Sequence, residues 1–208
     1  MKRLFVILIL FPVLAVHAQY DTTSVQRQSL WAPASGAVLL TSGSLFTFNP
    51  YLKNYAVRLR DTVQSDGHPR LQFDDYLQYV PGATPVMLNL CGVKGRHDFK
   101  KQILLEGGSY LLGVVFLEIG KYGIGVERPD CANTTSFPSG HTFTAFTGAE
   151  VLRREYGEEY PWIAVAGYAV ATLIGAMRIY NNRHWVGDVL AGAGLGILST
   201  SAVYWFFD

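Results

Sequence analysis

The chain has 208 residues, a length that suits one domain of ordinary size. Half of the residues are hydrophobic and only 16% are charged, against roughly 25% in a typical soluble domain. The formal net charge of +1 excludes the broad basic excess that non-specific nucleic-acid binding requires, so no nucleic-acid partner is expected.

The first residues predict a secretory signal peptide over residues 1–18. Met1-Lys2-Arg3 is a short basic start, Leu4–Val16 is an apolar run of suitable length, and Val16-His17-Ala18 offers a cleavage site. An uncleaved anchor helix is the alternative, although Pro12 and the short span fit it less well. Either interpretation places the following residues outside the cytoplasm, and residues 19–208 are expected to form a single domain.

Apolar and amphipathic segments of helical length follow one another along this domain, with no internal repeat. They predict an all-α fold, a bundle of five or six helices that crosses the membrane. In chain order the segments are Ser35–Phe48, Tyr51–Gln78, Pro81–Val93, Ile103–Gly120, His141–Tyr156, Pro161–Met177 and Val186–Phe207.

Two basic segments predict how the bundle is oriented in a membrane. Lys94–Lys101 and Arg153-Arg154 are separated by two helices, so both can face the cytoplasm while the polar loop Tyr122–Gly140 faces outward. This parity requires that Ser35–Phe48 does not fully cross, and we expect that segment to be interfacial or re-entrant. A soluble helical enzyme with buried apolar helices is the alternative.

Three groups of polar residues stand at the ends of predicted helices. They are Lys121 with Arg128-Pro129, then Pro138-Ser139-Gly140-His141, and finally Arg178 with His184 and Asp188. The charge pattern places all three groups at one end of the bundle.

Each group suits a phosphate. Ser139 is a natural N-cap, so the helix that follows would direct backbone N–H groups and its positive dipole end at an anion, and Gly140 allows close approach. Lys121, Arg128 and Arg178 supply cationic donors that match phosphate oxygens.

His184 and Asp188 stand four residues apart at a helix start and therefore share a face. A carboxylate in that position can accept the Nδ1–H of the imidazole and leave Nε2 free as a nucleophile. Taken singly, a His/Asp pair or a basic residue near a membrane end is more often structural, and it is the conjunction of the three groups that favours catalysis.

The two cysteines leave an alternative open. Cys91 and Cys131 could pair in an oxidising compartment, or they could be two unrelated thiols.

Together, Lys121–Pro129, Pro138–His141 and Arg178–Asp188 resemble the three signature motifs of the type 2 phosphatidic acid phosphatase superfamily, which also includes bacterial class A acid phosphatases and vanadium haloperoxidases. The resemblance covers residues 103–207. The local sequence Tyr180–Gly192 is similar to the membrane-bound bacterial lipid phosphatases.

The resemblance implies a role for each motif residue. His184 would attack phosphorus and form a phosphohistidine, Asp188 would orient it, and His141 would act as general acid and then base. The phosphoryl oxygens would be held by Lys121, Arg128, Ser139, Gly140 and Arg178. No metal and no cofactor is implied.

One position departs from the family pattern. The third motif usually has Ser before its arginine, and here that position holds Met177, so weakened phosphate contacts are expected.

The expected substrate is a lipid phosphate, with lipid A or undecaprenyl pyrophosphate favoured over phosphatidylglycerophosphate and phosphatidic acid. The expected location is the bacterial inner membrane with the site facing the periplasm. Alternatives are a soluble periplasmic acid phosphatase, a vanadate-dependent peroxidase, or a non-catalytic envelope protein.

Overall fold

The computed structural model describes residues 30–208, and the expected signal peptide lies outside the described residues. Every regular element in this range is a helix, which confirms the all-α prediction. There are eight helices within it rather than five or six, because each of the seven predicted segments forms a helix and the one expected at Tyr51–Gln78 divides into a long helix and a single turn. In chain order they are α2 (Trp31–Phe48), α3 (Pro50–Gln64), α4 (Asp74–Leu77), α5 (Val80–Leu90), α6 (Phe99–Ile124), α7 (Gly140–Tyr156), α8 (Pro161–Tyr180) and α9 (Val186–Phe207).

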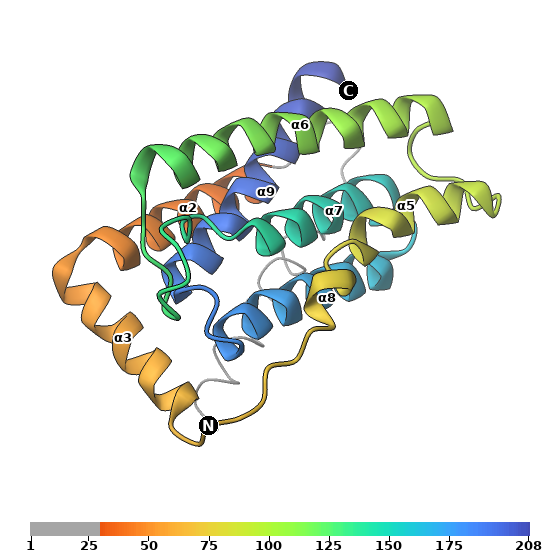
Figure 1. Cartoon of the computed structure of the whole chain (residues 1–208). Helices are drawn as coiled ribbons and strands as arrows, with labels where there is room; N and C mark the ends of the chain where they lie inside the picture. Colours follow the sequence, from red (N-terminus) through yellow and green to blue (C-terminus); the bar gives the residue numbers. More distant parts are fainter. Residues whose placement is uncertain (1–29) are drawn as a thin grey trace.

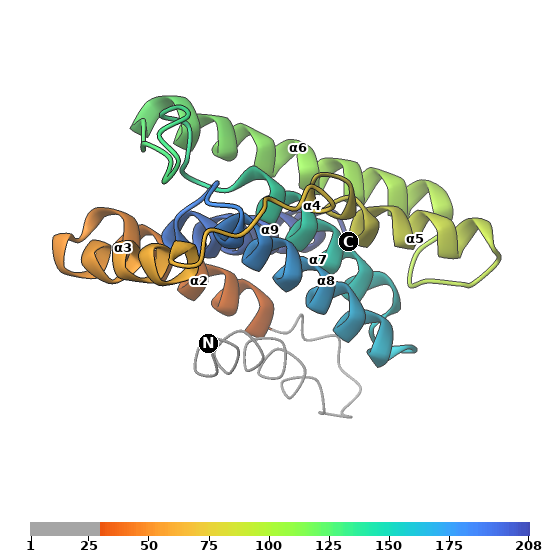
Figure 2. The ribbon, with the colours of Figure 1, turned by 60° about the horizontal axis from the view of Figure 1, so that its bottom comes forward.

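Helix α9 lies at the centre of the bundle, and α2, α6 and α7 pack around it (Figure 1). Figure 2 shows α6 on one side of this core and α2 with α3 on the other. Small residues allow this close packing, since the first half of α9 carries four buried glycines, Gly187, Gly192, Gly194 and Gly196. Their missing side chains allow neighbouring backbones to approach closely.

Helices α2 and α9 run antiparallel with their backbones in contact at two levels. A Cβ on Gly43 would lie 2.4 Å from the backbone nitrogen of Ala191, and a Cβ on Gly194 would lie 2.4 Å from that of Leu40. Helix α2 therefore follows α9 along much of its length. The interfacial or re-entrant position expected for Ser35–Phe48 stays a prediction, and α2 is not among the helices of the described residues that are apolar and long enough to cross a membrane.

Three helices are long and apolar enough to cross a membrane, namely α6, α8 and α9, among the residues described. They differ in where their side chains point. Helix α9 is mostly enclosed by protein, whereas α6 exposes large apolar side chains such as Leu104, Leu111 and Ile119. An apolar row of this kind is expected on a surface that faces lipid.

The predicted basic segments meet at one end of the bundle. Backbone N–H of Arg96 donates to the carbonyl of Glu155 at 2.8 Å, and the imidazole of His97 lies between Glu155 (2.9 Å) and Asp208 (2.7 Å). These contacts join the start of α6 to the ends of α7 and α9. The loop after α6 and the link between α8 and α9 lie at the opposite end (Figure 1).

Candidate active site

His184 lies in the short link between α8 and α9, and only 2% of it is exposed. Its Nδ1 is 3.5 Å from Oδ2 of Asp188, which is 0% exposed in the first turn of α9. The predicted pairing is therefore present, although 3.5 Å is longer than a good hydrogen bond. With Nδ1 turned toward Asp188, Nε2 is the ring nitrogen available for chemistry.

Two neighbours that the motif reasoning missed hold the carboxylate of Asp188. The hydroxyl of Ser136 and the backbone N–H of Trp185 (2.9 Å) both donate to its Oδ2. Ser136 Oγ also lies 3.5 Å from Nδ1 of His184. Ser136 stands five residues before His141 in the run Ser-Phe-Pro-Ser-Gly-His, so its place beside a signature motif was the available signal.

The start of α7 is packed against α9 at the same point. Ser139 is the N-cap of α7 as predicted, but its hydroxyl makes no capping bond and instead accepts from Thr142 at 3.0 Å. Its backbone N–H donates to the carbonyl of Asp188 at 3.0 Å. A Cβ on Gly192 would lie 2.5 Å from the carbonyl oxygen of Ser139, so this approach requires glycine.

The three predicted cations come from three different segments and lie around the contact between the start of α7 and α9. Lys121 is in the last turn of α6, where its Nζ donates to the carbonyl of Thr135 at 3.3 Å and would lie 4.0 Å from a Cβ on Gly140. Arg178 is buried in the last turn of α8, and Arg128 lies in the loop after α6. The structure thus brings all eight predicted residues to one end of the bundle.

Several buried polar atoms at this end have no hydrogen-bond partner among residues 30–208. They include Nε of Arg128, Nε of Arg178 and Oδ1 of Asp188. Unsatisfied buried donors cost free energy, and two guanidinium groups with free N–H donors match an oxyanion.

The surroundings of His184 keep its imidazole neutral. Burial lowers the pKa of His184 to about 4, and the positive charges of Arg178 and Arg128 act in the same direction. Asp188 opposes the shift without reversing it. A neutral ring at physiological pH has a lone pair to attack with, which is what a histidine nucleophile needs.

Two carboxylates on α4 also reach the site, and neither was predicted. Asp74 is buried and accepts from Nη1 of Arg178 at 2.7 Å and from Nδ2 of Asn181 at 3.2 Å. Oδ1 of Asp75 lies 2.8 Å from Nε2 of His141 and 3.2 Å from Nη1 of Arg178. No motif marks them, because they lie in a charged segment far from the signature groups in sequence.

Two remaining expectations have structural outcomes. Met177 is buried in α8 directly before Arg178, so no hydroxyl is offered at that position. Cys91 and Cys131 are both free and exposed, which excludes the disulfide alternative in this structure.

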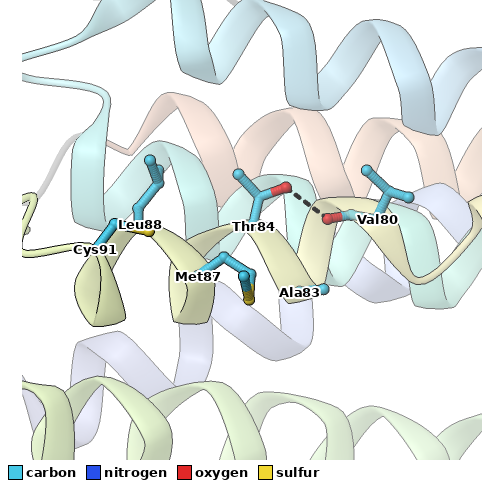
Figure 3. A pocket seen from close by; sticks show the side chains of 6 residues that line it. All are labelled: Val80, Ala83, Thr84, Met87, Leu88 and Cys91. Carbon is cyan, nitrogen blue, oxygen red and sulfur yellow. Dashed lines mark hydrogen bonds between the residues drawn. The ribbon is translucent and has the colours of Figure 1, made fainter.

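Two surface hollows accompany helix α5. One, of about 310 Å³, runs along its outer side and is lined by Val80, Ala83, Thr84, Met87, Leu88 and Cys91 (Figure 3). It contains none of the predicted site residues. The other, of about 440 Å³, lies between α5, α6 and α7 and includes Thr144, one turn from His141.

Comparisons with known proteins identify relatives of this chain. Residues 102–208 match the family model described as the PAP2 superfamily. The chain is 40% identical over 171 residues to a lipid A 1-phosphatase of Porphyromonas gingivalis (81% of this chain, 37% of the relative). It is 32% identical over 99 residues to an undecaprenyl-diphosphatase of Sulfolobus acidocaldarius (42% and 47%). It therefore spans less than half the length of either relative.

A solved structure shares the fold. The crystal structure of Aquifex aeolicus LpxE is similar with a TM-score of 0.56 and 26% sequence identity. The likeness covers 71% of this chain and 93% of that one.

Proposed function

Since the chain belongs to the PAP2 superfamily, we propose that it is a metal-independent phosphatase that hydrolyses phosphate monoesters or pyrophosphates of membrane lipids. The observation that carries the proposal is the site itself. A buried, neutral His184 lies among Lys121, Arg128 and Arg178, with Asp188 behind its ring. This is the arrangement needed to bind a phosphate and attack its phosphorus.

In the first step, Nε2 of His184 attacks phosphorus in line with the departing oxygen. The N–P bond forms as the P–O bond breaks, and His141 gives its proton to the leaving oxygen. Asp188, held by Ser136 and Trp185, stabilises the positive charge that appears on the ring of His184.

In the second step, the neutral His141 takes a proton from water as the water oxygen attacks phosphorus. The N–P bond breaks, phosphate leaves, and both histidines return to their starting states. Throughout, Lys121, Arg128 and Arg178 balance the charge on the phosphoryl oxygens, with the Ser139 hydroxyl and the Gly140 N–H as further donors. These cations supply the electrostatic stabilisation that other phosphatases obtain from metal ions.

A lipid phosphate fits the position of the site. The site lies at one end of a bundle whose α6 carries a row of exposed apolar side chains, so a headgroup can enter while its acyl chains stay in the bilayer. The basic segments around Arg96 and Arg154 gather at the other end, which the positive-inside rule assigns to the cytoplasm. We therefore place the site at the periplasmic face of the inner membrane.

The names of the relatives favour lipid A 1-phosphate or undecaprenyl pyrophosphate as substrate. The P. gingivalis relative matches over the greater share of this chain, so lipid A is the first choice.

The decisive experiment incubates the purified protein in detergent micelles with a panel of lipid phosphates and measures phosphate release. A ³²P-labelled substrate is followed in parallel for label retained on the protein after acid-free denaturation. His184→Ala should release no phosphate and retain no label, whereas His141→Ala should still acquire label because its nucleophile is intact. Full activity of His184→Ala would remove it as the nucleophile.

A wild-type protein inert toward every lipid phosphate would refute the function. Activity released from cells by osmotic shock without detergent would instead favour a soluble periplasmic phosphatase.

A further inference from the structure

The imidazole of His141 has a carboxylate partner from a distant part of the chain. Oδ1 of Asp75 lies 2.8 Å from its Nε2, and α4, which carries Asp75, packs against α8 beside the site. A carboxylate at this distance requires a hydrogen on Nε2, because an ionised carboxylate only accepts. Nδ1 is then the nitrogen of His141 that remains for proton exchange.

The carboxylate of Asp74, next to Asp75 in the sequence, has a different role. Asp74 is 1% exposed and fixed by both Arg178 and Asn181. The side chain of Asp75 is 53% exposed, and it contacts His141 and Arg178. Asp74 thus anchors the guanidinium group, while Asp75 is directed at the imidazole.

The environment of His141 otherwise works against the role of an acid. Burial lowers the pKa of His141, and the positive charge of Arg178 on α8 lowers it further. Lys121 on α6 adds a second cation near the start of α7. The groups that raise this pKa are Asp75, through its hydrogen bond and its charge, and, more weakly, Asp74.

We propose that Asp75 is a positioning residue of the phosphatase reaction, whose carboxylate accepts Nε2–H of His141 and keeps that imidazole protonated until Nδ1 delivers a proton to the leaving oxygen. Each histidine of the site then has its own carboxylate partner, and the two imidazoles are held in opposite protonation states. Asp188 serves a ring that burial keeps neutral for attack, and Asp75 serves a ring that must hold a proton. Asp75 itself exchanges no proton in this cycle. This inference rests on the proposed function.

The test replaces the carboxylate by a neutral group of the same shape, Asp75→Asn, with Asp75→Ala as a second variant. Asp66→Asn is the matched control, because Asp66 lies in the segment between α3 and α4, and its carboxylate accepts a hydrogen bond from Ser65. Two readouts are compared. One is the pH profile of kcat, and the other is the titration of the His141 imidazole by ¹⁵N NMR in micelles without substrate.

In both Asp75 variants the imidazole pKa of His141 should fall by about one unit or more, as expected when a neighbouring negative charge is removed. The alkaline limb of kcat should move to lower pH by the same amount, while Asp66→Asn matches the wild type in both readouts. A variant that is merely misfolded would lose activity at every pH without shifting the limb.

An unchanged pKa of His141 in Asp75→Asn would overturn the proposal. An unshifted alkaline limb of kcat together with a lower KM would also overturn it, since Asp75 would then only compete with phosphate for Arg178. The NMR titration needs no turnover, so it separates this outcome from a failure of the phosphatase function itself, which would show as a wild-type protein that releases no phosphate.

Discussion

Replacing Gly192 by alanine tests whether the close contact between α9 and the start of α7 is needed for catalysis. The added Cβ would lie 2.5 Å from the carbonyl oxygen of Ser139 and 3.3 Å from the backbone nitrogen of Phe143. A comfortable contact is about 3.5 Å, so the two backbones must separate by about 1 Å. That movement would stretch the bond from the Ser139 N–H to the carbonyl of Asp188, now 3.0 Å.

A displacement of this size in a site that depends on fixed geometry typically lowers the rate by about 100-fold. We expect kcat/KM for phosphate release from a lipid phosphate in micelles to fall by that order, and the free energy of unfolding to fall by about 1–3 kcal/mol. The matched control is Gly107→Ala in the middle of α6, where a Cβ meets nothing within 4 Å. Alanine there should keep full activity and leave stability equal or slightly higher. A folded Gly192→Ala protein with wild-type kcat/KM would refute the reasoning.

Three further outcomes are expected. Because the pKa of His184 is lowered to about 4, its imidazole stays neutral in mild acid. The value of kcat/KM, corrected for ionisation of the substrate phosphate, should therefore decline only near pH 4. A decline of kcat/KM near pH 6.5 would contradict this prediction. Ser136→Ala removes a donor to the charged Asp188 and should lower kcat by about 10- to 100-fold with little change in KM; an equal loss through KM would mean that Ser136 binds substrate. Gly194→Val should lower the thermal unfolding temperature in detergent, because the valine side chain would clash with the backbone of Leu40. An unchanged unfolding temperature would show that α2 can move away from α9 at little cost in stability.

Regular elements were predictable where the apolar run had clear limits. Val186–Phe207 was expected and is found with those bounds, because the run is apolar except for Asp188 near its start. The helix expected at Ile103–Gly120 is longer, from Phe99 to Ile124. Its start is extended by Asp98, whose side chain accepts from the backbone of Lys101, and Gly125 ends it in a left-handed conformation.

The site was predictable in its signature residues and not in their supports. Spacing alone placed His184 and Asp188 on one face, and the structure shows them in contact. Asp75 could not be found in this way, because it reaches His141 from 66 positions away through tertiary packing. In sequence it resembles any solvated carboxylate of a charged segment.

The position of α2 had an unused signal. Gly36 and Gly43 are seven residues apart, as are Gly187 and Gly194, and the structure pairs the two sets across α2 and α9. Equal spacing of glycines on two apolar helices indicates a close crossing. This spacing could have predicted from the sequence that α2 packs against α9.

The contact between α2 and α9 bears on where this protein can be cut or recombined. The family match begins at residue 102, yet one side of the helix that carries Asp188 is covered by α2, which ends more than fifty positions before that residue. A fragment limited to the matched region would lack α2. The side of α9 that packs against α2 would then be exposed to lipid or detergent. Joining this catalytic half to another N-terminal region would therefore require a helix with glycine at the two positions where α2 contacts α9.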